Sequence, residues 1–161
     1  MLFRSDRASA RRPNDPEIYR RRAPLLQAAG DKAGAARAYD TALRLVPGDA
    51  TLHYGRGKLR AAAPGNDERN DKGALEDFDA ALALAPDNVD VLIRRGDVQV
   101  RLRRFDDAAQ SYSRAIALDR RSAVAYEKLC RVETLLARDL AAARADCDRA
   151  DRKSTRLNSS H

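Results

Sequence analysis

Side chains with the chemistry for catalysis or metal binding are few in this sequence and are scattered along it. His53 is the only histidine before residue 161, and Cys130 and Cys147 are the only cysteines. A catalytic or metal site needs several such groups that converge. The sequence has no glycine-rich phosphate loop, no HExxH motif and no paired-carboxylate signature. We therefore predict that the protein is not an enzyme and that it holds neither a metal nor a cofactor.

These three residues all fall on inward positions of helical patterns. His53 stands where a large apolar residue would meet a neighbouring helix, which predicts a partly buried, hydrogen-bonded imidazole. In the recurring helical unit described below, Cys130 stands where the first helix carries a small residue, and Cys147 stands where the second helix carries an aromatic one. These positions predict buried thiols. The two thiols would lie near enough to pair in an oxidising compartment, and the sequence leaves their redox state open.

The elements that must position these residues are pairs of amphipathic helices that recur along the chain. The clearest pair is in 89–122, where Gly96 marks the first helix and a polar turn lies near Arg103 and Arg104. Small residues let two helices approach closely, and an aromatic fills the space between them. The sets that carry this pattern in the second helices are Ala35, Tyr39 and Ala42; Ala74, Phe78 and Ala81; and Ala108, Tyr112 and Ala115.

A recurring unit of about 34 residues with this pattern resembles the tetratricopeptide repeat (TPR). The resemblance extends over about 16–150 and implies an all-α fold, a right-handed α-solenoid of helix–turn–helix repeats. We expect a disordered basic arm over 1–15, repeats over 16–49, 50–88 and 89–122, and an incomplete repeat over 123–150.

Two features depart from the regular pattern. Pro24 lies inside the first helix, where proline removes a hydrogen bond and predicts a bend or a poorly anchored first half. Pro47 and Pro86 are 39 residues apart, which predicts an insertion of about five residues in the polar segment 64–73. We expect this insertion to be a loop, either a tolerated lengthening or a binding loop at one rim.

The last eleven residues, 151–161, look like the in-frame translation of a common short-read sequencing adapter. The repeat pattern stops at Ala150, immediately before them, so we interpret this tail as non-native and the chain as truncated. An incomplete last repeat would lack the polar cap that terminal repeats normally carry. We therefore expect residues after about Arg138 to be the least stable, and the uncapped repeat to offer a surface for self-association.

The net charge of +7 lies mostly in the two ends of the chain. Residues 1–13 carry +3 and residues 151–161 carry +2, which leaves +2 for 14–150. A nucleic-acid footprint spread along the fold is therefore not indicated. The sequence has no signal peptide and no long apolar run, so we expect a cytoplasmic protein that does not bind membranes.

The resemblance implies that the first helices of stacked repeats line a groove for an extended peptide or a partner's helix. We expect Tyr54, Ile93 and Val100 to act as apolar anchors. The full set of groove candidates is Arg20, Gln27, Tyr54, Lys58, Ile93, Asp97, Val100, Arg101, Glu127 and Arg131. The charge contacts among them are Arg20, Lys58 and Arg101.

The sequence thus favours a protein–protein interaction module whose partner it does not identify. One alternative is a structural spacer segment of a longer multidomain TPR protein, and a less favoured one is nucleic-acid binding through the Arg-rich helices. The clamp by which some TPR domains grip chaperone C-termini is not predicted. Pro24 and Gly55 replace its two asparagines, and Asp90 would repel a carboxylate.

Overall fold

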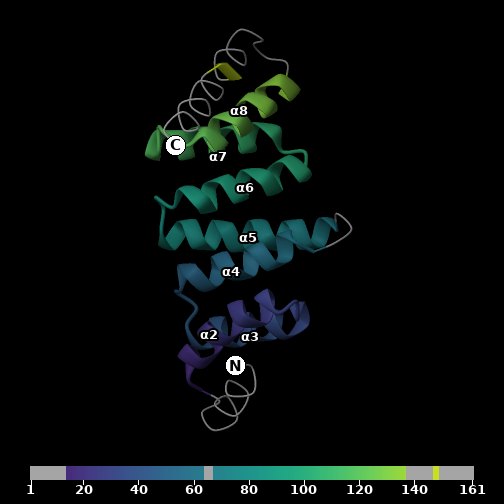
Figure 1. Cartoon of the computed structure of the whole chain (residues 1–161), viewed down its shortest axis with the longest axis vertical. Coiled ribbons are helices and arrows are strands. Elements are labelled where there is room, and N and C mark those ends of the chain that lie inside the picture. Colours follow the sequence, from purple (N-terminus) through teal and green to yellow (C-terminus); the bar gives the residue numbers. More distant parts are fainter. Residues whose placement is uncertain (1–13, 64–66, 137–146, 149–161) are drawn as a thin grey trace, which may run out of the picture. The chain divides into compact units, whose positions relative to one another are not determined.

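The computed structural model of the chain describes residues 14–63, 67–136 and 147–148. The elements of this described part are helices, which Figure 1 labels in chain order. Their bounds are α2 (Pro16–Ala28), α3 (Lys32–Leu45), α4 (Ala50–Ala61), α5 (Glu68–Leu84), α6 (Val89–Arg101), α7 (Phe105–Leu118) and α8 (Ala123–Leu136).

The chain divides into two compact units, one ending at Pro86 and the other beginning at Asp87. In the first unit α2 packs on α3, α3 on α4, and α4 on α5. In the second unit α6 packs on α7, and α7 on α8. Sequential packing of helix–turn–helix pairs confirms the predicted all-α repeat fold.

Most of the helices begin at an aspartate or asparagine whose side chain accepts a hydrogen bond from a backbone N–H of the first turn. Such capping satisfies N–H groups that have no partner inside the helix. The residues that cap α2 to α6 in this way are Asp15, Asp31, Asp49, Asp67 and Asn88. At α7 the equivalent position is Arg104, which makes no such bond.

The turns inside two of the helix pairs share one backbone conformation. Gly30 follows α2 with a φ of 83°, and Arg103 follows α6 with a φ of 58°. In each turn the next N–H reaches back to a carbonyl of the preceding helix, from Asp31 to Leu26 and from Arg104 to Gln99. Glycine adopts this left-handed conformation at little cost, whereas arginine does not.

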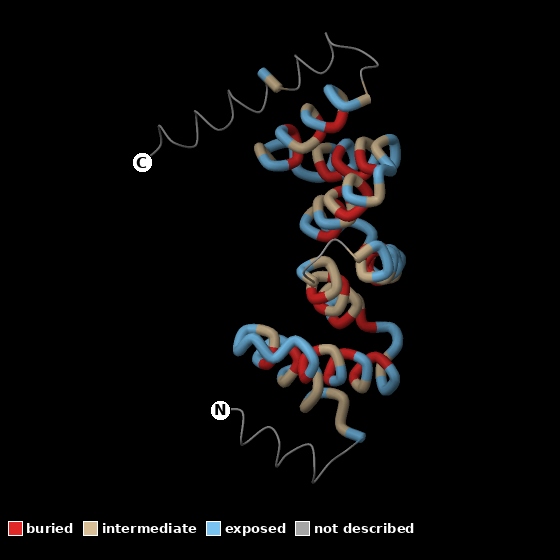
Figure 2. The backbone as a smooth tube through the Cα atoms, turned by 90° about the vertical axis from the view of Figure 1, so that its right-hand side faces the viewer, coloured by how far each residue is buried: buried red, intermediate tan, exposed pale blue. Residues whose placement is uncertain are grey.

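In each unit, paired helices approach closely where a glycine of one helix faces an aromatic ring of the other. A Cβ added at Gly57 would lie 2.7 Å from the Phe78 ring, and one added at Gly96 would collide with Tyr112. Both rings are buried, as are the small residues around them. In Figure 2, buried residues alternate with exposed ones along the helices. The predicted pairing of small residues with aromatics is therefore confirmed.

The two irregular features of the sequence are Pro24 and the segment 64–73, and helices include Pro24 and part of that segment. Helix α2 continues through Pro24, with Ala23 and Leu26 buried on either side of it. The expectation of a loop over 64–73 is wrong for residues 68–73, which form the start of α5. Helix α5 has 17 residues against 14 in α3, and an ion pair of 2.8 Å between Lys72 and Glu68 supports its first turn.

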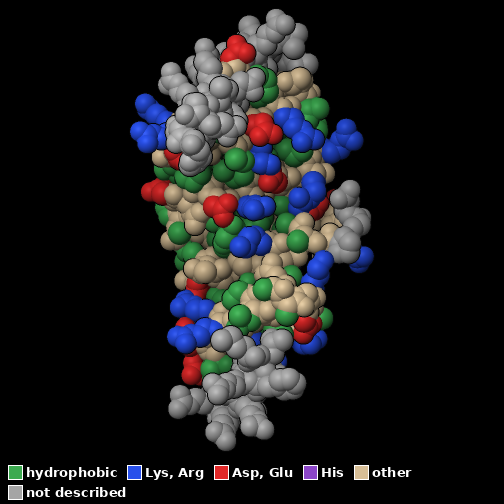
Figure 3. All heavy atoms as spheres, in the orientation of Figure 1, with side chains coloured by type: hydrophobic (Ala, Val, Ile, Leu, Met, Phe, Trp, Pro, Cys, Tyr) green, Lys and Arg blue, Asp and Glu red, His purple; other side chains and the backbone are tan. Residues whose placement is uncertain are grey.

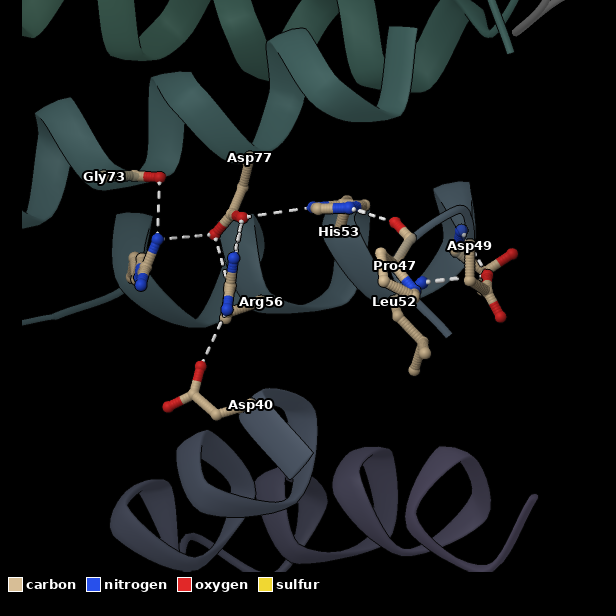
Figure 4. Close-up of polar contacts among 10 residues, drawn as sticks. Asp40, Pro47, Asp49, Leu52, His53, Arg56, Gly73 and Asp77 are labelled. Carbon is tan, nitrogen blue, oxygen red and sulfur yellow. Dashed lines mark hydrogen bonds and ion pairs between the residues drawn. The ribbon is translucent and has the colours of Figure 1, made fainter. Parts of the chain in front are cut away.

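A buried carboxylate joins α4 to α5. Asp77 accepts hydrogen bonds from Arg56 at 2.7 and 3.1 Å and from Arg60 at 2.8 Å (Figure 4). Arg56 also donates to Asp40 of α3 at 2.7 Å, so one guanidinium links three helices. Burial alone would lower the pKa of Arg56, but the bonds to Asp77 and Asp40 more than offset this and raise it.

The second unit has a counterpart of this contact in which a hydroxyl takes the place of the buried carboxylate. Ser111 of α7, like Asp77 of α5, directly precedes the buried aromatic, and it donates to Gln99 of α6 at 2.7 Å. Arg95 in turn donates to the Ser111 hydroxyl at 2.9 Å. The same position therefore carries a polar tie between paired helices in both units, although the chemistry differs.

Several sequence expectations concern residues outside the described part. These are residues 1–13 of the basic arm expected over 1–15, the tail at 151–161 and most of the segment after Arg138 that we expect to be least stable. Among the helices that are described, none has the length and apolar character to cross a membrane.

The left-handed turn at Arg103 predicts a stabilising substitution. We expect Arg103→Gly to raise the free energy of unfolding by about 0.5 kcal/mol, because relief of roughly 1–2 kcal/mol of backbone strain exceeds the entropic cost of glycine. Chemical denaturation measures the change. Arg104→Gly is the matched control: its φ is −90°, so it should lose stability. Equal losses of stability in both variants would contradict the interpretation that the backbone at Arg103 is strained.

The Asp77 contact predicts a large loss of stability on truncation. We expect Asp77→Ala to lower the free energy of unfolding by about 3 kcal/mol, because it leaves Arg56 and Arg60 without their buried partner. Asp40→Ala removes a bond to the same Arg56 from a side chain that is 53% exposed, so its effect should stay within about 0.5 kcal/mol. Similar effects of the two substitutions in urea denaturation would show that burial of Asp77 is not what matters.

Candidate functional site

The only histidine outside the tail is part of the packing between α4 and α5. Its Nε2 donates to the carbonyl oxygen of Pro47 at 2.9 Å, and its Nδ1 lies 3.4 Å from Asp77 (Figure 4). The His53 side chain is 16% exposed, so the predicted partly buried, hydrogen-bonded imidazole is confirmed. Within the described residues, no three His, Cys, Asp or Glu side chains gather as metal ligands do.

The two cysteines form a disulfide, which corrects the expectation of buried thiols. Cys130 of α8 is bonded to Cys147, with 5.1 Å between their Cα atoms, and both residues are half-buried. Cys130 stands at the position that Gly96 holds in the preceding repeat, and Cys147 at the position of Tyr112. A covalent bond therefore takes the place of the glycine–aromatic contact at these two positions.

In the first unit the groove candidates are engaged in pairs. Tyr54 lies beneath the ammonium group of Lys58, 4.4 Å from nitrogen to ring centroid, and its ring is 6.1 Å from that of Phe78. Gln27 accepts a hydrogen bond from the Tyr39 hydroxyl at 3.2 Å. The last of the four, Arg20, forms an ion pair with Asp49, the residue that caps α4. Among these candidates, the aromatic–cation pair of Tyr54 and Lys58 is therefore the one best suited to contact a ligand.

In the second unit four candidates line one cavity of about 270 Å³. The structure brings together Asp97, Val100 and Arg101 of α6 with Arg131 of α8. Three further described residues belong to the lining, namely Tyr112 of α7 with Lys128 and Val132 of α8. We call this cavity the Tyr112 pocket.

Polar contacts fix the arrangement of the Tyr112 pocket. The Tyr112 hydroxyl donates to Asp97 at 2.9 Å, and the Lys128 ammonium lies 2.6 Å from the same carboxylate oxygen. Burial, and then the charge of Asp97, raise the pKa of the Tyr112 phenol, whereas Arg131 and Arg101 act to lower it. Tyr112 therefore remains a neutral donor, with two guanidinium groups close enough for their charges to reach it.

The remaining candidates of this unit lie outside the pocket lining. Ile93 is half-buried and packs against the core cluster of Ala108, Tyr112, Leu129 and Val132. Glu127 is exposed on α8. Ile93 therefore supports the pocket from behind, and Glu127 has no part in it.

Sequence reasoning missed the contribution of Lys128 and Val132, although a signal for it exists. Asp97, Val100 and Arg101 are spaced i, i+3, i+4 on α6, and Lys128, Arg131 and Val132 have the same spacing on α8. Residues so spaced share one helix face. The pattern groups residues within each helix, but only the packing of α6, α7 and α8 shows that the two groups meet at Tyr112.

The surface around these features is mixed in charge. On the face shown in Figure 3, basic and acidic side chains are interspersed with apolar ones. The described large hydrophobic residues that are exposed include Val124 and Leu135 of α8, at 50% and 54%.

The sequence matches the tetratricopeptide repeat family over residues 20–89, 67–124 and 93–156. Together these matches extend over most of the chain. No curated protein sequence matches it.

Solved structures of other proteins share the fold. MamA (41-end) from Desulfovibrio magneticus RS-1 is 19% identical with a TM-score of 0.85, over 96% of this chain and 84% of that one. YrrB, described as a TPR protein with an unusual peptide-binding site, is 23% identical with a TM-score of 0.80, over 92% and 74%. The first TPR of Spaghetti, bound to the HSP90 peptide SRMEEVD, is 19% identical with a TM-score of 0.69, over 76% and 93%. At these identities the likeness is one of fold.

The disulfide predicts a redox dependence of stability in the last repeat. The two cysteines are 17 residues apart, and opening a loop of this length costs about 3 kcal/mol in the chain-entropy account of cross-links. We expect a reducing agent to lower the free energy of unfolding of the unsubstituted chain by about this amount. Cys147→Ser should show the same loss and no further response to reductant. A wild-type chain indifferent to reductant would contradict the disulfide.

Proposed function

The chain belongs to the tetratricopeptide repeat family, and we propose that it captures a peptide or a partner's helix on the exposed faces of its first helices. The family is one of protein–protein interaction modules and scaffolds. The segments proposed to meet the ligand are α2 and α4 in the first unit and α6 and α8 in the second. Ligand identity is not part of this proposal.

The observation that carries the proposal is the Tyr112 pocket. Its lining combines apolar walls, from Val100 and Val132, with charged groups held in place by hydrogen bonds. Ligand sites in proteins typically have this composition, an apolar surface with a few positioned polar groups. In the first unit, the half-buried Tyr54 and Lys58 offer a second contact of mixed character.

Two proteins of the same fold support peptide capture as the mode of binding. YrrB is described as having a peptide-binding site, and the first TPR of Spaghetti is bound to an HSP90 peptide. Stacked helices with a polar and apolar lining can take either an extended peptide or an amphipathic helix. We propose the same general mode for this chain.

A display library of capped octapeptides tests the proposal on the full chain. We expect enriched peptides that bind one to one, with affinity measured by isothermal titration. Val100→Ala should weaken binding about fivefold or more, because it removes two methyl groups of apolar contact. Val100 also touches the core, so thermal unfolding must show that the variant is folded at the binding temperature.

Leu118→Ala is the matched control. It removes an apolar side chain that is 42% exposed at the end of α7, outside the Tyr112 pocket, and should leave affinity unchanged. Failure of the library to yield any peptide above an unrelated protein would contradict peptide capture. An equal loss of peptide affinity in the Val100→Ala and Leu118→Ala variants would show that the peptide binds outside the Tyr112 pocket.

A further inference from the structure

The charges of the Tyr112 pocket are unevenly divided. Among the described residues, three cations line it, from Arg101, Lys128 and Arg131, against one carboxylate, that of Asp97. Asp97 is already occupied, because it accepts from the Tyr112 hydroxyl at 2.9 Å and lies 2.6 Å from the Lys128 ammonium. The described part of the lining therefore carries more positive than negative charge.

The two arginines come from different helices and both line the Tyr112 pocket. Arg101 lies at the end of α6 and Arg131 in the middle of α8, and both residues are exposed. Their charges both act on the Tyr112 phenol, from helices on either side of the pocket. Guanidinium groups bind carboxylates through paired N–H donors in a planar fork.

The rest of the lining limits what can carry that anion. Val100 and Val132 form apolar walls, and the pocket of about 270 Å³ is large enough for one or two side chains. An isolated inorganic anion would leave these walls exposed to water. An acidic side chain next to an apolar one on the same peptide would satisfy both parts of the lining.

We propose that the Tyr112 pocket binds an acidic segment of a partner protein, with an Asp or Glu carboxylate between Arg101 and Arg131 and an apolar neighbour against Val100. This rests on the peptide capture proposed above and specifies its ligand class. Lys128 and Asp97 act as positioning residues: their ion pair and the Tyr112 hydroxyl hold the floor of the pocket.

A nucleic acid is the other polyanion that arginines commonly bind, and the pocket fits it poorly. Single strands are held by a track of cations together with aromatics on which bases stack. The aromatic of this pocket, Tyr112, is buried and presents its hydroxyl toward Asp97. The cations are also gathered at one cavity, together with a carboxylate.

The test selects capped random octapeptides on the full chain and on the double variant Arg101→Glu/Arg131→Glu. We expect peptides selected on the wild type to be enriched in Asp or Glu next to an apolar residue. The double variant should bind the best acidic peptide about tenfold or more weakly, because each lost contact is charge-assisted. Replacing the peptide's acidic residue by its amide should weaken wild-type binding similarly and have little effect on the variant.

Arg120→Glu is the matched control, with the same charge change at an exposed site on the turn between α7 and α8. It should leave peptide affinity within about twofold, since Arg120 is not among the described lining residues and exposed charges are screened by salt. Circular dichroism confirms that each variant is folded.

The outcomes separate the two proposals. Peptides that bind without acidic enrichment, or that bind the double variant equally well, would overturn the acidic ligand class and leave peptide capture standing. A complete absence of selected peptides would overturn peptide capture itself. Tighter binding of a single-stranded oligonucleotide, lost in the double variant only, would assign the arginines to nucleic acid and overturn the inference.

Discussion

The close approach of paired helices is the constraint on which the rest of this structure depends. At Gly57 and Gly96 an added methyl group would run into the rings of Phe78 and Tyr112. Protein interiors are packed too densely to make room for such a group without displacement. The buried rings in turn fill the space between the helices and supply much of the apolar area that the fold removes from water. In the last repeat, Cys130 and Cys147 bridge the equivalent gap with a covalent bond.

Polar ties beside these rings give each helix pair a defined register. Asp77 binds Arg56 and Arg60, and Ser111 binds Gln99 and Arg95. A buried polar group is costly unless its partners are in place, so each tie disfavours alternative packings of its two helices. The tie at Asp77 demands more of its surroundings than the tie at Ser111, because loss of both arginines would leave a buried carboxylate without a counter-charge.

The same packing creates the surface that we propose for ligand binding. The Tyr112 ring is part of the core, yet its hydroxyl reaches Asp97 at the floor of the pocket. Val100 likewise lines the pocket while packing against the core cluster. Binding side chains are thus supported directly by buried ones, which keeps the pocket preformed and lowers the entropy lost when a ligand binds. The peptide capture that we propose would benefit from this kind of preorganisation.

Local patterns in the sequence determined the helices and their pairing. Apolar periodicity, capping aspartates and the spacing of small residues around Tyr39, Phe78 and Tyr112 are local, so the all-α repeat fold could be predicted from them. Tertiary structure decided the rest. In the folded chain, residues 68–73 are helical and the two cysteines are bonded to each other. Asp77 binds arginines of the neighbouring helix. Arg101 and Arg131 line one pocket, to which Glu127 does not belong. Such contacts join side chains from different helices, and their distances depend on how the helices pack, which no single stretch of sequence encodes.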